Sequence, residues 1–100
     1  MSIAQRPLWT PEEFEVELAE MVAEEAPRLF AVVREHPGWV DAEISAWGMA
    51  FGDHADAISL GGTVYLGMPN AERALWFHRA GGRVTPRLMW VDELPRRLSD

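Results

Sequence analysis

Apolar residues near the start of the chain recur with the period of a helix. A capping-box pattern at residues 10–13 marks the helix start, and the spacing predicts a helix from Pro11 to about Ala26. Pro27 either kinks this helix or opens a second short helix that ends near Glu35. The apolar positions of this pattern are Phe14, Leu18, Met21, Val22, Leu29 and Val33.

The pattern then changes to the alternation that is typical of a strand. Residues 39–51 alternate at first between apolar and polar positions, which predicts a half-buried strand. Further along, Trp47, Met49 and Phe51 place apolar bulk on the face that was polar before. Either a bulge near Gly48 resets the alternation, or a second surface covers this face.

Three more elements follow. Residues 57–60 and 63–66 flank a glycine pair and predict two short strands in a tight hairpin. A helix is expected over residues 71–79, and a last strand over residues 83–92. Pro86 lacks an amide hydrogen, which favours an edge position for this last strand.

This order of elements predicts an α+β fold, a two-layer sandwich. Helices would cover one face of a mostly antiparallel four-stranded sheet. We expect residues 1–9 to form an N-terminal arm, residues 10–92 a single domain and residues 93–100 a polar C-terminal tail. The expected core residues are Phe14, Leu18, Val22, Leu29, Ile44, Leu75 and Leu88.

Charge is distributed unevenly along the 100 residues. Residues 1–50 carry 10 acidic and 3 basic side chains, whereas residues 51–100 carry 6 of each, so the first half holds the whole net charge of −7. On the predicted helix four glutamates lie within about 60° of one another. They are Glu13, Glu17, Glu20 and Glu24. This stripe is either a solvated face or a docking surface for a basic protein, and it makes nucleic acid a poor partner.

Residues that could carry catalysis or bind a metal are few. The chain has no cysteine, and it lacks a phosphate-binding loop, a dinucleotide fingerprint and a zinc-helix pattern. Residues 53–56 offer two aspartates and a histidine, but a metal site needs three or four ligands, and turn formation accounts for this segment. We therefore expect no metal, no cofactor and no catalytic residue. The apolar runs are too short to cross a bilayer, and we expect a cytoplasmic protein without a membrane partner.

One segment resembles a known family. In "MPNAERALWFHRAGGRVTPRLMWVDE" a short helix with Ala74–Phe77 is followed by Gly81–Arg83, Thr85-Pro86 and Trp90–Asp92. This quarter of the chain is similar to the end of small immunity proteins from bacterial polymorphic-toxin systems. The resemblance implies a bacterial protein that binds another protein.

Two hypotheses of function follow. In the first, the chain is a non-enzymatic interaction module, such as an immunity protein, an antitoxin or a small regulator, and its acidic helix docks a basic partner. In the second, it is a small ligand-binding domain or a small enzyme, with a pocket between sheet and helices that involves Trp47, His54, His78 or Trp90. The apolar face of Trp47, Met49 and Phe51 also predicts a homodimer, because such a patch usually marks an interface.

Overall fold

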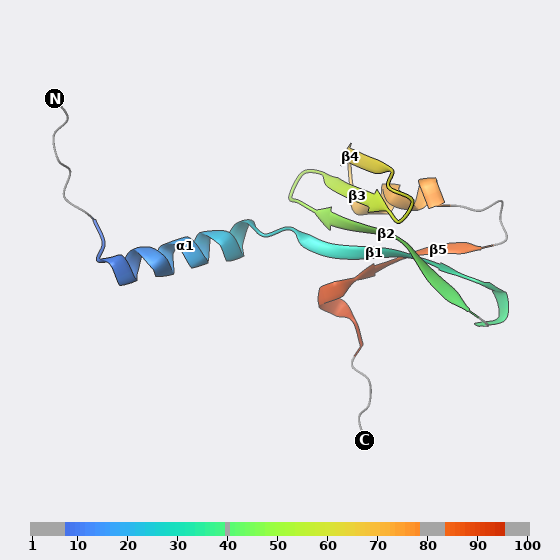
Figure 1. The fold of residues 1–100 in the computed structure, drawn as a ribbon, viewed down its shortest axis with the longest axis horizontal. Helices are drawn as coiled ribbons and strands as arrows, with labels where there is room; N and C mark the ends of the chain where they lie inside the picture. The colour runs from blue at the N-terminus through green and yellow to red at the C-terminus, as the bar shows by residue number, and fades with distance from the viewer. Residues whose placement is uncertain (1–7, 40, 79–83, 96–100) are drawn as a thin grey trace, which may run out of the picture.

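The computed structural model describes residues 8–39, 41–78 and 84–95 and shows a helix followed by an antiparallel sheet (Figure 1). The five strands lie in the order β4-β3-β2-β1-β5, and each neighbouring pair is antiparallel. The α+β class and the antiparallel sheet are thus confirmed, with five strands in place of four. The elements are α1 (Pro11–Glu25), β1 (Arg28–Glu35), η1 (Pro37–Trp39), β2 (Ala42–Ala50), β3 (Ala55–Ser59), β4 (Val64–Met68), the 3₁₀ helix η2 (Ala71–His78), β5 (Thr85–Trp90) and η3 (Val91–Glu93).

The additional strand comes from residues that the sequence pattern predicted as helix. Residues 28–35 form β1, which pairs with β2 on one side and β5 on the other. Pro27 ends the helical segment, because α1 stops at Glu25 and the next residue is already extended. The run Leu-Phe-Ala-Val-Val that follows is short and partly β-branched, and such a run fits a buried strand as well as a helix.

Of the two alternatives for β2, a bulge is present, but it lies at Ser45 and not near Gly48. Val32 pairs with Ala46 and Val33 pairs with Ile44, so Ser45 has no partner on β1. The Ser45 hydroxyl is buried and donates a hydrogen bond to the carbonyl oxygen of Val32, 3.2 Å away. Because Ser45 is an extra residue on β2, the alternation between buried and exposed side chains shifts by one position after it.

The second half of the fold follows the sequence closely. The β3–β4 hairpin turns at Gly61-Gly62, where Gly62 has a φ of 95°. Asn70 begins η2 as a cap, because its side-chain oxygen accepts a hydrogen bond from the Arg73 amide at 3.0 Å. β5 lies at the edge of the sheet, as Pro86 predicted. Residues 79–83, which include the expected end of the helix and the first residue of the last strand, lie outside the described residues.

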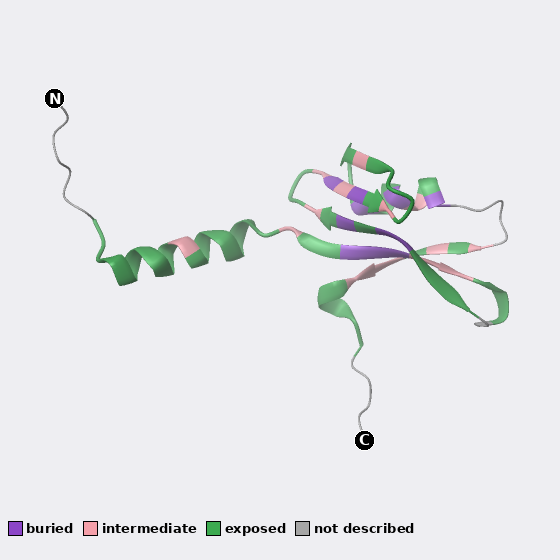
Figure 2. Ribbon diagram, viewed as in Figure 1, coloured by how far each residue is buried: buried purple, intermediate pink, exposed green. Residues whose placement is uncertain are grey.

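The core lies between η2 and one face of the sheet, and small residues dominate it (Figure 2). Its buried members are Phe30, Val32, Ala46, Ala55, Ala57, Met68, Ala71 and Ala74. The expected core was largely wrong. Phe14, Val22, Leu29 and Ile44 are exposed, Leu18 is half-buried, and only Leu75 and Leu88 pack against the cluster. The alanines let η2 lie close to the sheet, whereas the side chains of Trp47, Met49 and Ile58 lie on the opposite face.

Helix α1 stands apart from the sheet and has no buried residue (Figures 1 and 2). Its start is as predicted: the Thr10 hydroxyl accepts from the Glu13 amide, and the Glu13 carboxylate accepts from the Thr10 amide. The radius of gyration is 20.0 Å, whereas a compact chain of this length has about 13 Å. Helix η2 covers one face of the sheet, whereas α1, which was expected to join it, does not.

Candidate functional site

The acidic stripe of α1 is fully presented to solvent. Glu13, Glu17, Glu20 and Glu24 are all exposed. Glu13 caps the helix start, whereas the other three make no ion pair with any residue that the structure describes. Like charges three and four residues apart on a helix repel one another, so the isolated helix carries an electrostatic cost that no ion pair within residues 8–39, 41–78 and 84–95 offsets.

The nearest arginine in sequence does not neutralise this stripe. Arg28 donates hydrogen bonds to Asp92 at 2.8 and 2.9 Å and to Glu93 at 2.7 Å, and its guanidinium lies 4.0 Å from the centre of the Trp90 ring. The guanidinium holds the pKa of the Asp92 carboxyl below its usual range. We call these four residues the Arg28 cluster. It joins the start of β1 to η3, and because its members lie 64 and 65 residues apart in sequence, no local pattern signalled it.

A second stripe on α1 is apolar. It consists of Phe14, Leu18, Met21 and Val22, and its centre lies about 115° around the helix from the centre of the acidic stripe. Phe14, Met21 and Val22 are exposed. Among the described aromatic residues, the Phe14 ring packs only on the Trp9 ring, with 5.8 Å between the ring centroids. The two stripes are therefore separate surfaces of one helix.

The sheet also presents an exposed apolar surface on the side opposite η2, which none of the described helices covers. We call it the open face. Its members come from four neighbouring strands, and the register sets Leu29 beside Met49, Trp47 beside Ile58, and Ile58 beside Val64. It comprises Leu29, Trp47, Met49, Ile58, Val64 and Leu66, all of them exposed.

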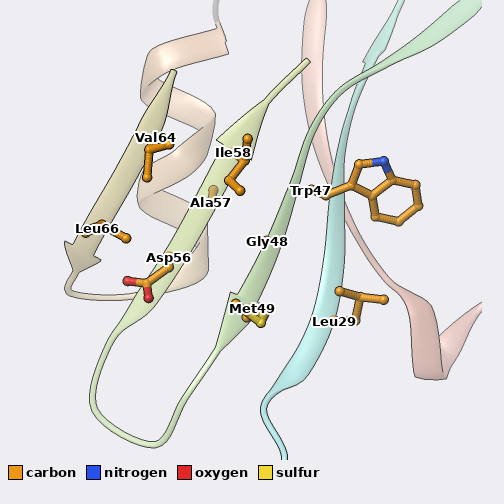
Figure 3. Close-up of a pocket in the computed structure, with 9 residues that line it drawn as sticks. All are labelled: Leu29, Trp47, Gly48, Met49, Asp56, Ala57, Ile58, Val64 and Leu66. Carbon is orange, nitrogen blue, oxygen red and sulfur yellow. The ribbon is translucent and has the colours of Figure 1, made fainter. Parts of the chain in front are cut away.

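A hollow of about 210 Å³ lies in the open face (Figure 3). Asp56 is the one charged residue that lines it, and this carboxylate accepts a hydrogen bond from the Gly67 amide at 2.8 Å. No set of polar groups converges on the hollow from the described residues. The hollow can therefore hold an apolar side chain.

The three residues predicted as one self-association patch do not share one surface. Trp47 and Met49 line the hollow, whereas Phe51 lies beyond the end of β2 and stacks on the His54 ring at 4.5 Å. Phe51 and His54 line a different cavity of about 250 Å³, together with Arg28 and other residues. The extra side chains of the open face, on β3 and β4, are not recognisable from sequence because strand pairing alone sets them beside Trp47.

The histidines and aspartates of the chain do not form a metal site within the described ranges. His54 Nδ1 lies 2.7 Å from Asp53 Oδ1, and this hydrogen bond lowers the pKa of Asp53. His54 Nε2 lies 4.0 Å from Asp56 Oδ1. Residues 8–39, 41–78 and 84–95 contain no group of three or more histidine, aspartate or glutamate side chains placed to hold a metal ion. Turn formation, with a hydrogen bond from the Phe51 amide to the His54 carbonyl oxygen, accounts for the segment.

His78 is buried on the other side of the sheet. The residue is 7% exposed, and its Nε2 has no hydrogen-bond partner among the described residues. Burial lowers the pKa of His78, and the Arg34 charge adds to this effect. The pocket hypothesis grouped His78 with Trp47, His54 and Trp90. These residues are separated: Trp47 lines the hollow, His54 and Trp90 line the second cavity, and His78 lines neither.

Comparison with known proteins adds no family to this description. No family model, curated protein or solved structure matches the chain at a significant level. Within the described residues, no helix is both long and apolar enough to cross a membrane.

Proposed function

We propose that the protein is a non-enzymatic interaction module that docks a basic partner protein through the acidic stripe of α1. The observation that carries this proposal is the isolation of α1, which has no buried residue and presents its glutamates without counter-charges from the described part of the chain. A helix of this kind adds little to the stability of its own fold. Its repulsive charge is offset only when a positive surface meets it.

The two other properties of the chain agree with this role. The net charge of −7 favours encounter with a basic protein and opposes contact with nucleic acid. The C-terminal resemblance to bacterial immunity proteins supports a partner that is itself a protein, met in the cytoplasm. An immunity protein, an antitoxin and a small regulator are the members of this class that we propose.

The test compares three forms of the full chain as bait in lysate of the native host. They are the wild type, the stripe variant E17Q/E20Q and the control E12Q/E15Q. Both variants change the net charge from −7 to −5, but Glu12 and Glu15 lie outside the acidic stripe. We expect the partner to be captured by wild type and control and to be reduced with the stripe variant.

The captured partner is then purified and its binding rates are measured. For the stripe variant, the association rate should fall several-fold, and the dissociation rate should change less. Added salt should slow association with the wild type more than with the stripe variant. Equal association rates for the two variants would show that only net charge matters and would overturn the proposed docking surface.

A further inference from the structure

The open face and the apolar stripe of α1 are two exposed apolar surfaces on one chain. We propose that two copies of this chain associate, with the apolar stripe of each α1 covering the open face of the other copy. This goes beyond the proposed function, because the acidic stripe lies on a different side of α1 and stays free in such a dimer.

Both surfaces of the proposed contact belong to this chain, which supports a second copy as the occupant. Three of the four residues of the apolar stripe and all six of the open face are exposed, so each copy presents both halves of one interface. In a two-fold dimer this contact is made twice. Each copy then contributes its stripe and its open face toward the roughly 800 Å² that a stable interface buries on each partner.

The connection between α1 and β1 directs the helix away from its own sheet. Only Ala26 and Pro27 separate the two elements. Ala26 has φ −62° and ψ 130°, and a residue before proline is held in such extended conformations. Figure 1 shows the result, with α1 continuing outward from the start of β1. Covering its own open face would require the chain to reverse within these two residues.

The dimensions and chemistry of the two surfaces match. The apolar stripe from Phe14 to Val22 runs about 12 Å along α1, and the four strands of the open face span about 14 Å across the sheet. The hollow of about 210 Å³ has room for a phenyl ring, because cavities of roughly 150 Å³ hold benzene. Phe14 is the aromatic member of the apolar stripe, and its ring would occupy the hollow of the other copy.

Two valines of α1 give a matched pair for the first test. Val22 belongs to the apolar stripe and Val16 does not, yet both are exposed, at 66% and 55%. By sedimentation velocity across the micromolar range, Val22→Asp should weaken dimerisation roughly tenfold or more, since a charge would enter an apolar interface. Val16→Asp carries the same charge and should leave the dimerisation constant within about twofold. A wild-type chain that stays monomeric, or equal effects of the two substitutions, would overturn the proposal.

Cross-linking identifies which surfaces meet. Because the chain has no cysteine, Val22→Cys and Ile58→Cys each introduce a single reactive thiol. The two single variants are mixed, treated with a short bis-maleimide, and the linked peptides are identified by mass spectrometry. We expect a product that joins Cys of one variant to Cys of the other, which only contact between copies can form. A dimer without this product would overturn the helix-to-sheet arrangement.

Salt separates this inference from the proposed function. Two copies that each carry −7 repel one another, so added salt should strengthen dimerisation, whereas it should weaken binding of a basic partner. A failed dimer test therefore leaves the acidic-stripe proposal standing, and a failed partner test leaves the dimer standing.

Discussion

Among the described glycines, Gly48 is the one at which an added methyl group should destabilise the sheet most. It lies opposite Phe30 on the neighbouring strand, and the Phe30 ring rests over it. A Cβ at Gly48 would lie 2.5 and 2.6 Å from Phe30 Cε1 and Cε2, and closer still to Cζ. Real contacts of Cβ atoms are essentially never under 3.0 Å, so the ring would have to move.

The Phe30 ring lies in the core. It is fully buried, and it packs edge-on against the Trp90 ring with 5.6 Å between centroids. Overpacking a core costs about 1–3 kcal/mol, and we expect Gly48→Ala to lie in the upper half of that range. Strand propensity acts in the opposite direction, because alanine is favoured over glycine by about 0.5–1 kcal/mol in a strand. The steric cost is larger than this gain, so we expect Gly48→Ala to lower the free energy of unfolding.

Urea unfolding at fixed pH measures this effect. Gly48→Ala should lower the free energy of unfolding by about 2 kcal/mol and the melting temperature by at least about 8 °C. Gly52→Ala is the matched control, because no heavy atom lies within 4 Å of the added Cβ, and it should change stability by less than about 0.5 kcal/mol.

A double variant tests the cause. If the ring contact is responsible, Gly48→Ala combined with Phe30→Leu should lose at least about 1 kcal/mol less than the two single losses together. Additive losses, or a Gly48→Ala protein as stable as wild type, would refute the reasoning.

Three further outcomes follow from the structure. Leu18→Ala should cost less than about 1 kcal/mol at protein concentrations low enough to keep the chain monomeric, because α1 has no buried residue; a loss of 2 kcal/mol in urea would mean that α1 packs on its own sheet. E17Q/E20Q should melt at the wild-type temperature or slightly above it, since repulsion is relieved, and a clear loss of stability would reveal ion pairs of these glutamates. Because burial lowers the pKa of His78, the unfolded chain binds more protons below about pH 6.5, and stability should fall as the pH drops from there toward the folded-state pKa. His78→Gln should flatten this slope in a series of melts.

The sequence revealed local structure well where a short motif determines it. The capping box at residues 10–13 and the hairpin at Gly61-Gly62 rest on contacts between near neighbours, and the edge position of β5 agrees with the missing amide hydrogen of Pro86. Residues 28–35 were missed because a run of five apolar residues has no period that separates a buried strand from a helix.

The core was missed for a different reason. The expectation assigned large apolar residues to the interior, but η2 approaches the sheet so closely that Ala46, Ala55 and Ala74 fill the space. The bulky side chains at Trp47 and Ile58 then point to the other side. Which face of a sheet receives the covering helix depends on contacts between distant residues, and one sequence does not encode it in a readable pattern.

The acidic stripe was the part of the candidate site that sequence could predict. It depends only on helical spacing, and the structure places all four glutamates on an exposed helix. The full open face could not be predicted, because it combines four strands whose pairing was not known. The Arg28 cluster could not be predicted for the same reason, because its partners lie more than sixty residues apart in the sequence.

The strand order has a consequence for how this sheet assembles. From β1 to β4 each strand pairs with the next one along the chain, so this meander can form through successive short loops. β5 instead returns to pair with β1, and contacts such as Phe30 with Trp90 close a loop of about sixty residues. Closures of this length are slow and come late in folding. We expect β5 and the Arg28 cluster that fastens it to form after the meander and to open first, so that amide hydrogens of β5 exchange with solvent sooner than those of β2.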